Sequence, residues 1–305
     1  MSRSTWRIPL LCAVLGGCAA APDTAPDPRV EARIAAHGEP VRVAMWIGDA
    51  EGRARVARRA NESLSAASAI KTAFLVELFA AHAGRLDQPA FAPGTLTNEW
   101  NRHFAAQLGA ERLAALGRRL AAASVRTLGV WMVRARGVDN LTYNAAANAV
   151  LERFGGPAGM TQAIHARDPG FAGIVVRRAM LAPRAEGDNV ASAASLAAVL
   201  GRIARGALPG VDDDTVQALR AVLRVEDDAV RGAHFAKGGS LDSDPITRVV
   251  AGWYERDGTA TVYVVMAAQP VAGSAAPGAA GRRLQELVVA LREIVLSDAG
   301  VAVGR

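Results

Sequence analysis

The segment RVVAGWYERDGTATVYVVMA, residues 248–267, decides the class of fold. Its two halves, 248–254 and 259–267, are rich in valine, threonine and aromatic residues, which favour β-strands. The tripeptide RDG at 256–258 is typical of a tight hairpin turn, because aspartate and glycine tolerate the positive φ angles that such turns need. The segment therefore predicts two neighbouring antiparallel strands near the C-terminal end of the chain.

Further strands are predicted near both ends of the chain, with helices between them. Residues 41–47 and 53–59 flank a turn at Gly48-Asp49, and 235–241 form another strand. From residue 68 to about 206 the apolar spacing is helical instead. The predicted helices are 30–36, 70–81, 104–121, 125–135, 145–154, 191–203 and a final one with the apolar stripe Leu284, Leu287, Val288, Leu291, Ile294 and Val295. This order predicts an α/β (α+β) protein, in which strands from both ends form one antiparallel sheet and an all-helical lobe is inserted between them.

The composition excludes several classes of protein. The 305 residues are 51% apolar and 21% charged, which is typical of a globular chain and not of a disordered one. The formal net charge is +6, but no block of five like charges occurs, so we expect no nucleic-acid partner. Among the 35 basic Lys and Arg residues, only Lys71 and Lys237 are lysine. Because arginine stays protonated whereas a buried lysine can lose its proton, these two positions are candidates for chemistry.

The first residues are typical of an export signal. Two arginines precede an apolar run, residues 8–15, that is too short to span a bilayer. The run ends in Leu15-Gly16-Gly17-Cys18, which resembles the lipobox of bacterial lipoproteins, where the cysteine is lipidated and the chain is cut just before it. This resemblance implies a signal peptide over 1–17, a tether over 18–29 and a lipid anchor at Cys18 on the periplasmic side of a bacterial membrane. The alternative is an ordinary export signal in which Cys18 is incidental.

Lys71 belongs to an S-x-x-K element, Ser68-Ala69-Ile70-Lys71, at the start of a predicted helix. Side chains three positions apart share a helix face, so the Ser68 hydroxyl and the Lys71 amine can meet. Serine is a poor nucleophile until a base takes its proton, and lysine becomes such a base when burial or a second cation lowers its pKa. Taken alone, the element also fits a helix-capping serine followed by an exposed lysine.

Lys237 begins the element Lys237-Gly238-Gly239-Ser240 on a predicted strand. Two glycines weaken a strand unless something must approach its backbone closely. The strand edge could bind the backbone of a substrate, with Lys237 as a fixed positive charge. A bulge or a turn is the alternative explanation.

Together the two elements resemble the serine β-lactamase and penicillin-binding protein superfamily, whose motifs are S-x-x-K, S-D-N and K-T-G. Thr142-Tyr143-Asn144 stands where S-D-N is expected. Its continuation, Ala145-Ala146-Ala147-Asn148 and then Phe154-Gly155-Gly156-Pro157, is similar to the class A pattern SDNTAAN followed by a GGP turn. The resemblance covers most of residues 30–298. It implies a five-stranded antiparallel sheet flanked by terminal helices, with a sheet lobe over about 30–62 and 215–298 and a helical lobe over about 63–214.

The resemblance also implies a role for each matching side chain. Ser68 would be the acylated nucleophile and Lys71 its activating base. Thr142 would pass a proton to the leaving nitrogen, since its hydroxyl can both donate and accept. Asn144 would bind the amide side chain of the substrate and Lys71, and Lys237 would hold the substrate carboxylate.

The strand that carries the second lysine would contribute its backbone. The N–H groups of Ser68 and Ser240 would form an oxyanion hole, and Gly239 would lie against the substrate. Arg248 resembles the arginine that supports carboxylate binding in class A enzymes, and a structural arginine is an equally good interpretation.

The chain departs from the class A pattern after the GGP turn. Class A enzymes hydrolyse the acyl-enzyme with a glutamate in an E-x-x-x-N arrangement, but residues 171–183 contain no acid. Glu186 is the nearest acid, and its spacing to Asn189 is wrong, so a loop or cap role fits it better. Without such a base, the sequence leaves two outcomes open: a β-lactam is turned over with the help of another group, or it acylates Ser68 and stays. The segment 84–128 is also longer than the pattern requires, and it either reshapes the mouth of the cleft or pads the helical lobe.

No other chemistry is indicated. The five histidines show no paired ligand spacing, and Cys12 and Cys18 are lost to processing and lipidation, so we expect no metal and no cofactor. The leading hypothesis is a monomeric, lipid-anchored serine hydrolase that opens β-lactams, and so confers antibiotic resistance, or related D-alanyl amides of peptidoglycan. The alternatives are a D,D-peptidase or esterase that β-lactams inhibit, and a non-catalytic cell-wall binding protein. The two retained lysines disfavour the non-catalytic function, because every other residue among the Lys and Arg of this chain is arginine.

Overall fold

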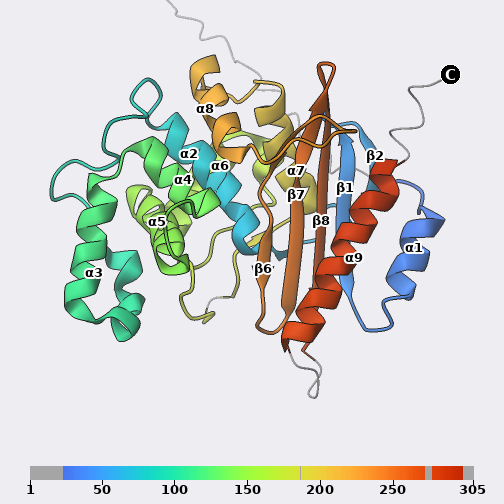
Figure 1. Cartoon of the computed structure of the whole chain (residues 1–305), viewed down its shortest axis with the longest axis horizontal. Coiled ribbons are helices and arrows are strands. Elements are labelled where there is room, and N and C mark those ends of the chain that lie inside the picture. The colour runs from blue at the N-terminus through green and yellow to red at the C-terminus, as the bar shows by residue number, and fades with distance from the viewer. Residues whose placement is uncertain (1–22, 186, 272–276, 298–305) are drawn as a thin grey trace, which may run out of the picture.

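The predicted fold class is confirmed: the structure contains an antiparallel sheet that is five strands wide (Figure 1). The structure is a computed structural model that describes residues 23–185, 187–271 and 277–297. Across the described sheet the order is β2-β1-β8-β7-β5, and a short strand, β6, also pairs with β7. The strands are β1 (Arg42–Asp49), β2 (Ala54–Arg58), β5 (Ala233–Ala236), β6 (Gly239–Leu241), β7 (Ile246–Arg256) and β8 (Thr259–Gln269). The single strand predicted over 235–241 is therefore divided in two, between Ala236 and Gly239.

The hairpin of β7 and β8 forms as predicted. The two strands pair along their whole length. At the turn, Asp257 and Gly258 have φ angles of +51° and +73°. Positive φ at both central residues is the geometry of a two-residue turn whose twist matches that of the strands.

Alternate residues of the strands enter two cores, one on each face of the sheet. In β1, Ala44 and Trp46 lie in the core shared with the helical lobe, whereas Met45 and Ile47 lie in the opposite core. The helices α1 (Pro28–Ala35) and α9 (Pro277–Ser297) cover that opposite face, and α7 (Ala193–Ala204) covers the first (Figure 1). From the predicted stripe, α9 buries Leu284, Leu287, Val288, Leu291 and Val295.

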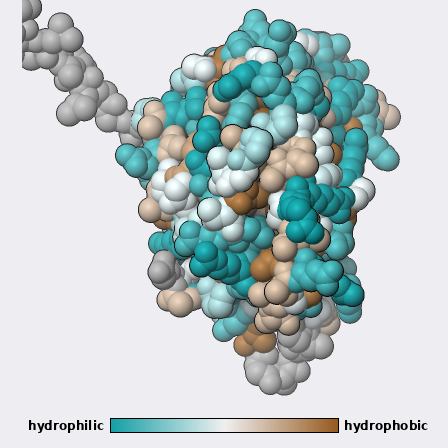
Figure 2. Space-filling view, turned by 90° about the vertical axis from the view of Figure 1, so that its left-hand side faces the viewer, coloured by the Kyte–Doolittle hydropathy of each residue, from teal (hydrophilic) through white to brown (hydrophobic). Residues whose placement is uncertain are grey.

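The helical lobe is inserted between β2 and β5 (Figure 1). Its elements are β3 (Leu64–Ser65), η1 (Ala67–Ile70), α2 (Lys71–Ala80), η2 (Glu99–Phe104), α3 (Ala105–Ala122), α4 (Val125–Arg134), α5 (Asn140–Arg153), α6 (Gly156–Arg167), η3 (Pro169–Phe171), β4 (Val190–Ala191), α7 and α8 (Asp213–Leu223). The central helix, α2, is buried from Lys71 to Phe79, and its Glu77 is paired with Arg167 of α6 at 2.7 Å. The face of the lobe shown in Figure 2 is mostly hydrophilic, as expected for a core that is enclosed by the outer helices.

One helix boundary bears directly on the site. α5 begins at Asn140, earlier than the predicted start at Ala145. Asp139 is the reason, because its carboxylate accepts a hydrogen bond from the Thr142 N–H at 2.7 Å and so caps the helix. Thr142, Tyr143 and Asn144 therefore lie in the first turn of a helix.

The N-terminal segment is partly docked onto the sheet. Residues 23–27 were expected within a tether, yet the Thr24 N–H donates to the Ala57 carbonyl at 2.8 Å. The Asp23 carboxylate also accepts hydrogen bonds from the backbone N–H groups of Arg59 and Ala60. The predicted signal peptide, Cys18 and Glu186 lie outside the described residues. In the part of the chain that the structure describes, no helix has the length and hydropathy needed to cross a membrane.

Candidate active site

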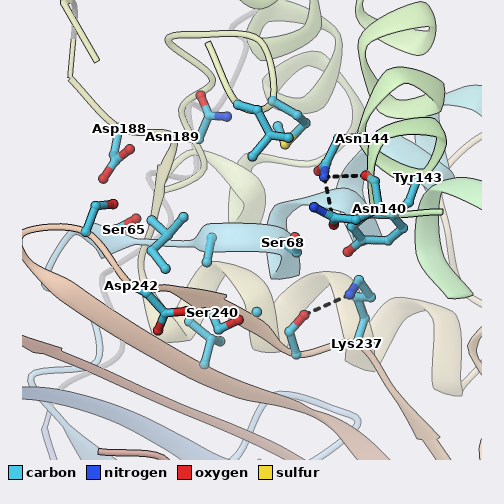
Figure 3. Close-up of a pocket in the computed structure, with 18 of the residues that line it drawn as sticks. Ser65, Ser68, Asn140, Tyr143, Asn144, Asp188, Asn189, Lys237, Ser240 and Asp242 are labelled. Atoms are coloured by element: carbon cyan, nitrogen blue, oxygen red, sulfur yellow. Dashed lines mark hydrogen bonds between the residues drawn. The ribbon is translucent and has the colours of Figure 1, made fainter. Parts of the chain in front are cut away.

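A pocket of about 800 Å³ lies where the helical lobe meets β6 and β7 (Figure 3). Five of the predicted site residues line it: Ser68, Asn144, Lys237, Gly239 and Ser240. They come from η1, from α5 and from the chain around β6, so the fold brings together segments that are far apart in the sequence. Lys71 lies behind the pocket wall, and neither Thr142 nor Arg248 is part of the lining.

Ser68 lies in η1, the short 3-10 helix that leads into α2. The residue before it, Ala67, has a φ of +45°, a left-handed conformation that is strained for a residue with a side chain. A side chain on Gly239 would place its Cβ 2.5 Å from the Ser68 nitrogen and 2.8 Å from the Ala69 nitrogen. Only glycine fits there, so β6 passes directly beside the backbone of the predicted nucleophile.

Gly238 has a different reason to be glycine. A Cβ at this position would lie 2.7 Å from the Val249 carbonyl oxygen of β7. The two adjacent glycines thus allow two close approaches, one to the sheet and one to Ser68. These two approaches of the protein's own backbone explain the glycine pair of the K-G-G element.

Lys71 is fully buried at the start of α2. Its ammonium donates to Asn144 Oδ1 at 2.9 Å and to the Tyr143 carbonyl at 3.5 Å, and it does not bond to Ser68. Burial, and secondly the positive charge of Lys237, lower the pKa of Lys71 well below its usual value. Within the described residues Lys71 forms no ion pair. Its amine can therefore lose its proton and act as a base.

Lys237 follows β5 and lines the pocket. Its backbone N–H donates to the Ala251 carbonyl at 2.9 Å, which fixes the residue against β7. Its Nζ donates to the Gly238 carbonyl at 2.9 Å, and no carboxylate of the described chain pairs with it. A fixed positive charge without a carboxylate partner suits an anionic group on a bound molecule.

Thr142 is a predicted site residue that the structure places elsewhere. Its side chain is buried, and hydrogen bonds from its backbone N–H and then its side chain lower the pKa of Asp139. Asn140, Tyr143 and Asn144 line the pocket instead. These three share a helix face because they are three and four positions apart, whereas Thr142 lies on another face. Thr142 was predicted because it matches a motif position, and recognition of Asp139 as the helix cap would have indicated Tyr143.

Arg248 is the second predicted residue that does not reach the pocket. It pairs with Ser240 across β6 and β7, and it is 8% exposed. Its guanidinium donates to the carbonyls of Leu241 and Thr247 and to Asp242 Oδ1 at 2.5 Å. A side chain on Gly281 of α9 would clash with it. Arg248 therefore stabilises the end of β6, which favours the structural interpretation over carboxylate binding.

The loop before β4 closes the other side of the pocket with Met180 and Leu181. Asn148 of α5 fixes this point of the loop, because its amide accepts from the Met180 N–H at 2.6 Å and donates to the Met180 carbonyl at 3.2 Å. Asp188 is the acid of this described loop that lines the pocket, and it is ion-paired with Arg178 and Arg184. The described loop therefore offers Ser68 no carboxylate that is free of an ion pair.

The segment 84–128 belongs to the helical lobe and not to the pocket, since none of its residues lines the described cavity. Asn101 donates to the Ala145 carbonyl and accepts from Asn148, both on α5. The structure therefore favours the interpretation that this segment packs onto the helical lobe over the interpretation that it shapes the mouth of the cleft.

Solved structures with a similar fold exist. A β-lactamase from Desulfarculus baarsii aligns with a TM-score of 0.58 and 21% identity, over 89% of this chain and 97% of the other. A class A β-lactamase from Mycobacterium abscessus aligns with a TM-score of 0.60 and 17% identity, over 89% and 98%. The chain has the β-lactamase-like fold.

At this level of identity the likeness concerns the β-lactamase-like serine hydrolase fold, and not a particular activity. No protein-family model matches the sequence, and neither does any curated protein. Function must therefore be argued from the pocket itself.

Proposed function

We propose that the protein is a serine acyl hydrolase that opens β-lactams or related D-alanyl amides through an acyl-enzyme at Ser68. The observation that carries this proposal is the pairing of a pocket-lining serine with a buried lysine three positions further on. The lowered pKa of Lys71, caused by burial and by Lys237, suits it to take the serine proton.

The reaction would proceed in two steps. Lys71 takes the proton of Ser68 Oγ as the oxygen attacks the carbonyl carbon, and the developing oxyanion accepts hydrogen bonds from the N–H groups of Ser68 and Ser240. The C–N bond then breaks, the nitrogen takes up the proton that Lys71 had accepted, and the acyl group remains on Ser68. In the second step water hydrolyses this ester and restores the Ser68 hydroxyl. The contact between Ser68 and Lys71 is expected to form when substrate binds, because catalytic hydrogen bonds are often long in free enzymes.

Lys237 would select the substrate. Its ammonium lines the pocket and pairs with no described carboxylate, so it suits the carboxylate that both β-lactams and D-alanyl peptides carry. Asn144 touches Lys71 on one side and the pocket on the other, which suits a residue that binds the amide of the substrate.

A second candidate function is a D,D-peptidase or esterase that β-lactams inhibit. The observation that favours it is the loop at Met180 and Leu181, where a thioether and a hydrocarbon face the pocket in place of a carboxylate. Without a base for the attacking water, the acyl-enzyme formed from a β-lactam would hydrolyse slowly.

We also propose that the chain is exported and lipidated at Cys18, that it acts on the periplasmic side of a bacterial membrane, and that it is a monomer. The lipobox-like LGGC at residues 15–18 supports the anchor. Extraction with and without detergent tests it: wild type should require detergent, and Cys18→Ala should not. If wild type is released without detergent as readily as Cys18→Ala, the proposed lipid anchor is refuted.

One experiment separates the two enzymatic candidates. The purified protein is mixed with a chromogenic cephalosporin, and both colour and intact mass are followed. Sustained turnover supports the β-lactamase activity, whereas a stable adduct of one antibiotic molecule supports the peptidase or esterase. Ser68→Ala should abolish both signals, and Ser63→Ala, which alters an exposed serine nearby, should abolish neither. Absence of both signals in wild type would refute the proposal.

A further inference from the structure

The side chain of Tyr143 lies between the two lysines of the chain. The Lys71 Nζ is 3.2 Å from the centre of the Tyr143 ring, and the Lys237 Nζ is 5.4 Å from it. In Figure 3, Tyr143 lies beside Asn144 on the wall of the pocket, with Lys237 and Ser68 near it. The same tyrosine also accepts a hydrogen bond from Lys71 through its backbone carbonyl. No motif predicted a role for this residue.

The ring separates Lys71 from the cavity. Tyr143 lines the pocket, whereas Lys71 has no exposed surface and is absent from the lining. The centre of the ring lies 3.2 Å from Nζ. A water molecule bonded to the ammonium would place its oxygen about 3 Å from Nζ, so no water fits between the amine and the ring. Asn144 occupies the neighbouring position on the same helix face, where it bonds to Nζ directly.

We infer that the aromatic ring of Tyr143 is the cover that keeps water of the pocket away from the Lys71 amine, and that the ring, not the phenol hydroxyl, makes Lys71 reactive. Tyr143 is thus a positioning residue, acting through Lys71. Its effect on catalysis rests on the proposed function, in which Lys71 activates Ser68. Its effect on the Lys71 amine is independent of the proposed function.

Two opposing effects of the ring must be weighed. The ring face attracts a cation, which favours the charged amine. Exclusion of water disfavours the charged amine, by as much as 3–5 pKa units for fully buried groups. Burial is the largest cause of the lowered pKa of Lys71, and the ring contributes to that burial because it lies between the amine and the pocket. Removal of the ring should therefore raise the pKa of Lys71, although it also removes a favourable contact of the charged form.

The surroundings of Lys71 contain few other charges that could produce the same effect. Among the described groups, Lys237 is the one charge that shifts its pKa, and it does so less than burial. Tyr143 is the titratable side chain in direct contact, and Asn144 is neutral. The elements packed on α2 contribute no further charge to this pKa.

The two lysines make the test direct. Protein labelled with ¹³C at the lysine ε-carbon gives two lysine signals, and a Lys237→Arg variant assigns the signal of Lys71. The signals are titrated in wild type, Tyr143→Phe and Tyr143→Ala. Tyr143→Phe keeps the ring, so the pKa of Lys71 should stay within about half a unit of wild type. Tyr143→Ala opens the cover, and the pKa should rise by about 1–3 units.

A second measurement needs no variant and so does not depend on the folding of Tyr143→Ala. An amine-acetylating reagent at pH 8 should modify Lys237 of the wild-type protein at least tenfold faster than Lys71, because the ring blocks access. Equal rates of acetylation would refute the cover. The inference would also be overturned by an unchanged Lys71 pKa in a folded Tyr143→Ala, or by an equal rise in Tyr143→Phe, which would assign the role to the hydroxyl.

The catalytic consequence is read from the rate of Ser68 acylation by a chromogenic cephalosporin as a function of pH. In Tyr143→Ala the acid limb should move to higher pH with the Lys71 pKa, with a tenfold loss of rate for each unit at pH values below that limb, whereas Tyr143→Phe should keep the wild-type profile. Complete absence of acylation in wild type would refute the proposed function, and the titration and the acetylation would still decide on the cover.

Discussion

Replacement of Gly239 by alanine should disable the site while leaving the fold in place. The new Cβ would stand 2.5 Å from the Ser68 nitrogen, 2.8 Å from the Ala69 nitrogen and 2.9 Å from the Ala67 Cβ. Ordinary contacts of a Cβ lie near 3.4–4 Å, so β6 and η1 must separate by about 1 Å. A shift of that size at reacting groups reduces the rate by about 100-fold.

The protein should tolerate the loss of stability that the same substitution causes. Overpacking by one methyl group destabilises a fold by about 1–3 kcal/mol, which a chain of this size can tolerate. The rate loss of about 100-fold corresponds to about 2.7 kcal/mol of transition-state stabilisation. The site should therefore fail in a protein that is still folded.

The assay is the second-order rate constant for acylation of Ser68 by a chromogenic cephalosporin, with urea unfolding measured in parallel. Gly238→Ala is the matched control, because its Cβ would press on the Val249 carbonyl at 2.7 Å and not on Ser68. Both variants should lose similar stability, and Gly239→Ala should acylate at least tenfold more slowly than Gly238→Ala. Equal acylation rates would refute the argument that β6 must approach the nucleophile.

Three further outcomes are expected. Glu77→Ala should lower the free energy of unfolding by about 1.5–3 kcal/mol, because it removes the two charged hydrogen bonds that join the buried Glu77 to the partly exposed Arg167. Burial lowers the pKa of His234 to about 4, so the unfolded chain binds its proton first, and stability should fall as the pH is lowered from about 6.5 to 4. Met180→Glu should place a carboxylate where the loop faces the pocket, and the acyl group on Ser68 should then leave at least about 100-fold faster.

Each of these outcomes has a control. Asp87→Ala breaks an exposed ion pair with Arg126 and should cost much less stability in the same urea titration, so equal losses for Glu77→Ala and Asp87→Ala would contradict the first. The melting temperature of His234→Gln should depend less on pH than that of wild type, and parallel curves would contradict the second. Met180→Gln should not shorten the lifetime of the adduct measured by mass, and a similar lifetime for the Gln and Glu variants would contradict the third.

Local chemistry determines the parts of the fold that were predictable. The turn at Asp257-Gly258 needs residues that tolerate positive φ, and the sequence supplies them at the position where the structure turns. The stripe from Leu284 to Val295 repeats with the helical period, and α9 buries it against the sheet. Such features depend on neighbours along the chain, so they can be read without the tertiary structure.

Where the structure differs from the expectations at the site, the causes are contacts that the chain makes across space and an unrecognised helix cap. Thr142 was favoured because it matched a motif position. In the helix that Asp139 caps, however, Tyr143 lies on the face that lines the pocket. Arg248 carried a charge suited to a carboxylate, and its partners turned out to be Asp242 and two carbonyls. The partners of a long side chain are not encoded in its spacing along the sequence.

The two lysines were the most informative compositional signal. Both lie at the candidate site: Lys71 is buried beside Tyr143, and Lys237 lies at the pocket wall without a described carboxylate partner. An arginine at position 71 could not release its proton and could not fit in the space of a fully buried lysine.

The central claim is that Ser68 is the nucleophile, and the site of the adduct tests it most directly. After incubation with a penicillin, trypsin cleavage at Arg59 and Lys71 places Ser68 on the peptide 60–71, which also holds Ser63 and Ser65. We expect a mass increase of one penicillin on this peptide in wild type and in Ser63→Ala, and none in Ser68→Ala. An adduct that persists in Ser68→Ala, or a wild-type protein that neither carries an adduct nor turns over the antibiotic, would contradict the account.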